Sequence, residues 1–174
     1  MQNEHPKPKA VTALIKSRIK SLKAQIQRLE KLMAAAIKAN PLLKQAVAAL
    51  IEVKGVGELT AISLLASMPE LGTLNRNQVA ALAGLAPFNC DSGTLRGKRA
   101  IYGGRHAVRQ ALYMSALVAA KHNEILSAAY REMVARGKAK KVALVAIMRR
   151  LLIHLNSIMS RVLREYNSPK SLTD

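Results

Sequence analysis

Apolar residues recur at spacings of three and four along most of the chain, which is the period of an α-helix with one buried face. No segment alternates apolar and polar residues as a half-buried strand does. Asn, Pro and Gly residues stand where the helical runs should begin or end. We therefore predict an all-α fold. The expected helices cover about 10–40, 41–52, 58–67, 75–83, 105–122, 123–136 and 139–165.

The first of these helices carries a heptad pattern. β-Branched residues stand mainly at one seam position and leucines mainly at the other, which favours a parallel two-stranded coiled coil. We predict a coiled-coil arm that joins the chain into a homodimer or higher oligomer. Three heptads are the minimum for this interpretation, and the alternative is an amphipathic helix that packs on its own domain. The seam consists of Ile15, Ile19, Leu22, Ile26, Leu29 and Met33.

Charge is spread unevenly over the chain. The whole chain has 28 Lys+Arg against 10 Asp+Glu and a net charge of +18. Residues 1–50 and 91–174 hold most of the cations, whereas 51–90 hold only two. This balance predicts a polyanionic partner, most simply double-stranded DNA. An anionic membrane surface is a weaker alternative because Trp is absent. The expected parts are a leader (1–9), a coiled-coil arm (10–40), a helical domain (41–166) and a tail (167–174).

Several kinds of chemistry find no support in the sequence. Cys90 is the single cysteine, so we expect neither an internal disulfide nor a cysteine-rich zinc site. The four histidines fall at no metal-ligand spacing, and we expect no metal or other cofactor in this chain. The longest apolar run, residues 111–120, is about half a membrane span. With no secretory signal pattern at the start, we expect a cytoplasmic, nucleoid-associated protein.

Two glycines interrupt the helical pattern in Val53-Lys54-Gly55-Val56-Gly57. This pattern between two helices predicts a helix-hairpin-helix motif. Both glycines are expected to make a tight turn with positive φ, and the absence of side chains lets a phosphate approach the next helix N-terminus. Lys54, Gly55 and Gly57 are therefore candidate phosphate-binding residues. A plain structural turn is the alternative.

The longest segment without a helical pattern, residues 85–104, carries Ser92 and several cations. A loop serine ordinarily caps a turn, and no histidine is placed to act as its base. Guanidinium groups can nevertheless hold a DNA phosphate and stabilise the charge that develops during phosphoryl transfer to a serine. The alternative is that Ser92 caps a turn while the cations grip DNA without chemistry. The candidate phosphate-binding cations are Arg96, Lys98, Arg99, Arg105 and Arg109.

The order of these motifs resembles one family. The hairpin VKGVGELTAISLLASM, then ALAGLAP-x4-SG, then a Gly–Arg–Arg–Leu segment and a basic last helix are similar to the DEDD-type insertion-sequence transposases, relatives of the Piv DNA invertases and the RNA-guided bridge recombinases. The resemblance covers about 45–165. It implies that Ser92 is the nucleophile that forms a covalent phosphoserine link with DNA. It leaves open whether a guide RNA takes part.

The chain departs from the family pattern in two respects. It has no room for the N-terminal RuvC-like domain whose four acids bind divalent metal, so we expect the linker coil plus the helical serine transposase domain, without activity on its own. The Asn and Leu expected in the segment 103–109 are replaced, whereas Arg109 and Leu112 remain. The predicted function is the DNA-binding, serine-bearing part of a transposase or site-specific recombinase. The alternative is a non-catalytic helix-hairpin-helix DNA-binding protein that dimerises through its coil.

Overall fold

The computed structural model describes residues 9–88 and 100–168, and it confirms the all-α fold. The chain divides into two compact units, Met1–Lys44 and Gln45–Asp174. The described helices begin and end within a few residues of the predicted positions. They are α1 (Lys9–Ala39), α2 (Pro41–Ile51), α3 (Glu58–Ser67), α4 (Arg76–Leu82), α5 (His106–His122), α6 (Glu124–Ala135) and α7 (Lys140–Asn167), with two short strands, β1 (Pro87–Phe88) and β2 (Ala100–Ile101).

The first unit is built on α1, a continuous helix of 31 residues. Its predicted seam is open to solvent in the single chain: Ile19 is 47% exposed and Ile26 is 54% exposed. Seam residues of a coiled coil are normally covered by a partner helix. The dimeric coil stays a prediction, and the exposed seam is the surface on which it depends.

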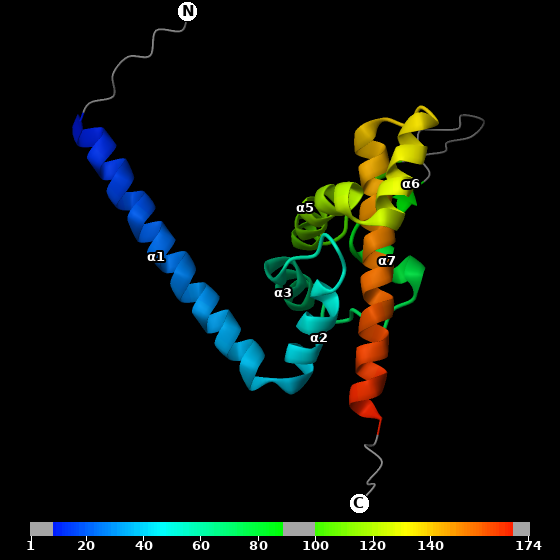
Figure 1. Cartoon of the computed structure of the whole chain (residues 1–174), viewed down its shortest axis with the longest axis horizontal. Coiled ribbons are helices and arrows are strands. Elements are labelled where there is room, and N and C mark those ends of the chain that lie inside the picture. The colour runs from blue at the N-terminus through cyan, green and yellow to red at the C-terminus, as the bar shows by residue number, and fades with distance from the viewer. Residues whose placement is uncertain (1–8, 89–99, 169–174) are drawn as a thin grey trace, which may run out of the picture. The chain divides into compact units, whose positions relative to one another are not determined.

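The second unit is organised around α7 (Figure 1). Helices α4, α5 and α6 each pack against α7, and α3 packs against α5. One apolar stripe of α7 is buried along its whole length and forms the core face of this helix. Burying each large aliphatic side chain contributes about 1.5–3 kcal/mol. The stripe consists of Leu144, Met148, Leu151, Leu155, Ile158 and Val162.

Helix α7 also explains an apolar stretch that could be mistaken for a membrane segment. It is the one helix in the described part of the chain long and apolar enough to cross a bilayer. More than half of that stretch (56%) is buried inside the protein, as expected for a core helix. Its buried Asn156 is fully engaged: the side-chain oxygen accepts from the Gly72 backbone N–H at 2.8 Å, and the amide donates to the Leu74 carbonyl at 2.7 Å.

Local capping fixes the starts of two shorter helices. Asn75 and Gln78 form a capping box at the start of α4, in which each side chain accepts from the backbone N–H of the other residue. Asn123 caps α6 by accepting from the Leu126 N–H at 3.2 Å. These local bonds satisfy N–H groups that a helix start leaves without an intrahelical partner.

The segment 85–104 is not wholly irregular, contrary to our expectation. β1 pairs with β2 in antiparallel register, with Pro87 opposite Ile101 and Phe88 opposite Ala100. We call this pair, with the chain leading to it on either side, the stem. Strands of two residues are too short to show alternation, so hydrophobic patterning could not reveal them.

We predict that Ile19→Lys combined with Ile26→Lys prevents dimerisation, because two charges would be buried at the seam. Light scattering should report the monomer mass, while circular dichroism shows that the remaining helices persist. Raising the salt concentration should strengthen the wild-type dimer, since the parallel heptad register places Arg18 opposite Lys23 of the second copy.

The matched control puts Lys at Ser21 and Gln27, which lie off the seam and add the same charge. It should leave the dimer mass unchanged. A wild-type chain that is monomeric at all salt concentrations would contradict the coil.

Candidate nucleic-acid interface

The glycine turn between α2 and α3 is held by two buried valines. The Val53 N–H donates to the Leu50 carbonyl at 3.3 Å, and the Val56 N–H donates to the Val53 carbonyl at 2.9 Å. Gly55 has φ +109°. Gly57 has φ −90° and ψ 166°, an ordinary extended conformation at the N-cap of α3. Our expectation of positive φ was therefore right for Gly55 and wrong for Gly57.

Gly55 packs against the backbone of α5. A Cβ atom on this residue would lie 2.8 Å from the Ala119 Cβ and 2.9 Å from the Ala119 backbone nitrogen. Since backbone cannot move aside as a flexible side chain does, any larger residue here would push the turn away from α5. The structure therefore gives Gly55 a packing role in addition to its turn conformation.

Gly57 leaves the N-terminus of α3 open to solvent. A Cβ on it would meet no atom within 4 Å. The unpaired N–H groups and the positive end of the helix dipole attract phosphate oxygens at such a position. Glu58 in the first turn of α3 carries a negative charge, which would repel a phosphate bound at this helix N-terminus. Thr60 accepts a hydrogen bond from the Ser115 hydroxyl at 3.1 Å, which ties α3 to α5.

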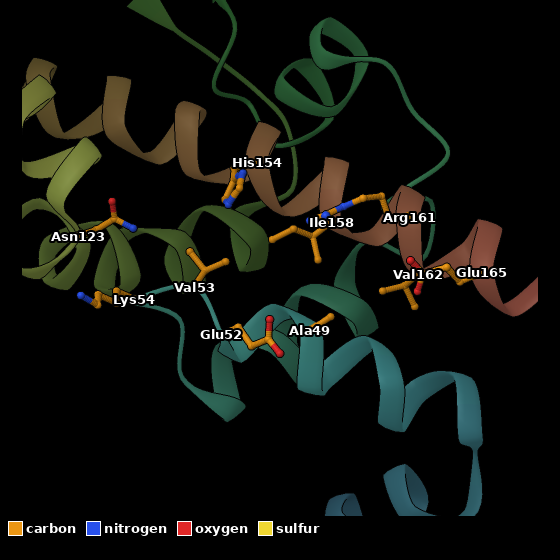
Figure 2. A pocket seen from close by; sticks show the side chains of 10 residues that line it. All are labelled: Ala49, Glu52, Val53, Lys54, Asn123, His154, Ile158, Arg161, Val162 and Glu165. Atoms are coloured by element: carbon orange, nitrogen blue, oxygen red, sulfur yellow. The ribbon is translucent and has the colours of Figure 1, made fainter.

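Lys54 lies on the rim of a pocket of about 470 Å³ between the end of α2 and one face of α7. Glu52 and Lys54 line one side, and His154, Arg161 and Glu165 of α7 line the other (Figure 2). The exposed Lys54 ammonium is 3.7 Å from a Glu124 carboxylate oxygen, an ion pair of little energetic weight. Acids and bases are mixed in this pocket, so it does not form a simple phosphate site.

At the base of the stem, two stretches of backbone touch without intervening side chains. A Cβ on Gly84 would collide with the Gly103 carbonyl oxygen, and a Cβ on Gly104 would collide with the Gly84 backbone. The Arg109 guanidinium donates to the Gly103 carbonyl and, at 3.4 Å, to the Ala83 carbonyl. Arg109 therefore joins the incoming and outgoing sides of the stem.

Arg105 forms a two-pronged ion pair with Glu70. Its Nη1 and Nη2 atoms each lie 2.6 Å from a Glu70 carboxylate oxygen, and Nη1 also donates to the Ser67 carbonyl at 3.0 Å. These side-chain hydrogen bonds are the main reason that the pKa of Glu70 falls from its usual 4.5 to about 2. The pair fixes the start of α5 to the turn after α3. Sequence reasoning missed Glu70 because it lies 35 residues from Arg105.

The candidate residues lie in three separate parts of the chain. Arg105 and Arg109 lie together at the start of α5, and the hairpin touches the other end of the same helix at Ala119. The rise of an α-helix separates these two places by roughly 20 Å, so they do not belong to one site. Ser92, Arg96, Lys98 and Arg99 lie within 89–99, outside the described residues.

The model of the Transposase IS116/IS110/IS902 family matches residues 47–131. Over this segment the chain resembles an insertion-sequence transposase. The segment runs from α2 into α6 and includes the hairpin, Ser92, Arg105 and Arg109, but it excludes α1 and α7. It spans just under half of the chain and supports a transposase-related role with a DNA partner. No curated protein matches the chain.

The resemblance implies that a divalent metal binds to a RuvC-like domain. The described residues of this chain do not form a metal site of their own. Within 9–88 and 100–168, no three His, Cys, Asp or Glu side chains come together as metal ligands.

We predict that Gly57→Asp weakens DNA binding about tenfold relative to Gly57→Asn, at equal fold stability. Asp and Asn cap helices equally well, and they differ here by one negative charge at the proposed phosphate contact. Fluorescence anisotropy with a random-sequence duplex measures the affinity, and thermal unfolding checks the fold.

The control pair is Ser63→Asp and Ser63→Asn, on an exposed position later in the same helix. It changes the net charge equally but should change affinity by less than a factor of two. Equal effects at Gly57 and Ser63 would show that only net charge matters.

We predict that wild type is more stable than Glu70→Gln at neutral pH and that this advantage disappears in acid. A carboxyl with a lowered folded-state pKa stabilises the fold fully above its unfolded value. The difference in unfolding free energy should hold down to about pH 4.5. It should shrink below that and vanish near pH 2. Urea unfolding at several pH values measures it, with Glu165→Gln as the control acid.

Proposed function

We propose that this chain is the serine-bearing, DNA-binding part of an insertion-sequence transposase that acts in DNA strand cleavage and exchange. The observation that carries the proposal is the family match over residues 47–131, which contains both the hairpin and the segment with Ser92. The net charge of +18 supports a polyanionic partner.

In the proposed chemistry, the Ser92 hydroxyl oxygen attacks the scissile phosphorus. A phosphoserine bond forms, the bond from phosphorus to one deoxyribose oxygen breaks, and the serine proton leaves as that sugar oxygen gains one. Attack by a strand hydroxyl on the phosphoserine reverses the step and rejoins DNA. Because one phosphoester replaces another, the exchange needs no external energy source. Guanidinium groups stabilise the added negative charge of the transition state.

The stem supports this proposal by giving the Ser92 segment two fixed ends. Phe88 and Ala100 flank residues 89–99 in the sequence, and these two residues face each other in the strand pair. Arg105 and Arg109 hold the base of the stem through protein acceptors. We therefore propose that these two arginines mainly position the segment, and that Arg96, Lys98 and Arg99 contact the phosphate.

The hydrogen bonds of Arg105 and Arg109 also support a second candidate function, DNA binding without catalysis. The terminal nitrogens of Arg105 already donate to Glu70 and Ser67, and Arg109 already donates to backbone carbonyls. A protein that only grips DNA through its hairpin, and dimerises through α1, needs no free arginines near Ser92. In that case the chain is a non-catalytic helix-hairpin-helix DNA-binding protein.

The remaining partners follow from the resemblance and are part of the proposal. We propose that a metal-bearing RuvC-like domain acts together with this chain, and that the α1 coil brings two copies to one DNA site. A guide RNA is a further candidate partner of the basic surfaces, as in the bridge recombinases that the sequence resembles.

We predict that Ser92→Ala abolishes covalent capture of DNA but leaves affinity within about a factor of two, because it removes a hydroxyl and no charge. The chain is fused to, or mixed with, a complete member of the transposase family and given suicide DNA substrates. Denaturing gels should show a protein–DNA adduct for wild type and none for the alanine variant.

Ser63→Ala is the matched control and should form the adduct at the wild-type level. Absence of an adduct for wild type in this setting would make Ser92 structural and favour the non-catalytic DNA-binding protein.

A further inference from the structure

A second cleft, of about 610 Å³, lies between the stem and the N-terminal half of α7. Its floor is aliphatic, and Leu85 at its base is buried. The α7 wall lies outside the segment that matches the transposase family. The residues that line the cleft are Leu85, Pro87, Ala100, Ile101, Lys138, Lys141, Val142, Val145, Ala146 and Arg149.

The charged residues that the structure places along the cleft all have the same sign. They are Lys138, Lys141 and Arg149, and no acid among the described residues lines it. In the described part of the chain, none of these three side chains is in an ion pair. Lys141, Val145 and Arg149 follow at intervals of four, so α7 presents cations and an apolar residue on one face.

This combination limits what the cleft can hold. A hollow of this size with mostly apolar walls and a few charged groups is typical of a small-molecule site. An occupant must cover apolar surface and carry negative charge at one side. A nucleotide does both, because its base has apolar faces and its phosphate is anionic. Paired bases of a duplex are stacked inside the helix and could not reach the floor.

We propose that this cleft holds one unpaired nucleotide of a DNA strand, with the base against the aliphatic floor and the phosphate between the cations. The inference rests on the proposed function, since it assumes a DNA partner. The cleft is lined by both strands of the stem, so the bound nucleotide would lie beside the two strands that precede and follow the Ser92 segment in the sequence. Strand exchange requires bases to leave their pairs, and the cleft would hold one of them.

The test measures the affinity of the full chain for two end-labelled duplexes that differ only in a central three-nucleotide gap. Wild type should bind the gapped duplex about five times more tightly than the paired one at the same salt concentration. Val142→Asn should bring this preference below twofold, while affinity for the paired duplex is kept. Val142 is 58% exposed, so the change does not threaten the core. Lys138→Gln with Lys141→Gln should also lower the preference.

Two changes of the same chemistry serve as controls. Val118→Asn alters a valine on α5 that is 46% exposed and does not line the cleft. Lys121→Gln removes a cation of the same helix, again outside the cleft. Both variants should keep the fivefold preference.

The outcomes separate the two proposals. Absence of binding to either duplex overturns both the DNA function and the nucleotide site. Equal binding to gapped and paired duplexes in wild type overturns only the nucleotide site and leaves the DNA function standing. Micromolar binding of free deoxyadenosine monophosphate that Val142→Asn abolishes would make this a free-nucleotide site and overturn the strand proposal.

Discussion

Burial of one face of α7 is the interaction on which the second unit depends. Helices α4, α5 and α6 pack directly on α7, and α3 is added through α5. The buried Asn156 then fixes the turn before α4 through two backbone groups. The apolar stripe supplies most of the stabilising free energy, but it tolerates small rotations of the packed helices. The hydrogen bonds of the buried Asn156 amide are directional, so they fix the orientation of the turn before α4.

Helix α5 links the hairpin to the base of the stem. The hairpin packs on Ala119 at one end of this helix, and Arg105 begins the other end. Their separation of roughly 20 Å corresponds to about six base pairs along a duplex strand. A single helix thus sets the spacing between the proposed nonspecific grip and the stem that leads to Ser92. The aliphatic cleft is a third surface, and no residue of α5 lines it.

The sequence predicted the helices well because their signals are local. The capping residues Asn75 and Asn123 and the α7 stripe depend on neighbours within a few positions. Contacts between residues far apart in the sequence could not be predicted from local patterns. The Arg105–Glu70 pair, the conformation of Gly57 and the strand pair of the stem each depend on how the chain folds back on itself. The spacing of Lys141 and Arg149 in the sequence is enough to place them on one face of α7. It does not show that the stem faces them across the cleft.

The contact between Gly84 and Gly104 has a consequence for how the sequence can change. Where a side chain meets a side chain, a substitution that enlarges one can be compensated by trimming the other. Here backbone meets backbone, and both residues already have the smallest possible side chain. No second substitution can restore the space that a methyl group at either position would occupy. Substitutions of Gly84 or Gly104 at the base of the stem therefore have no compensating second mutation. Sequence changes in the stem must be confined to its other residues.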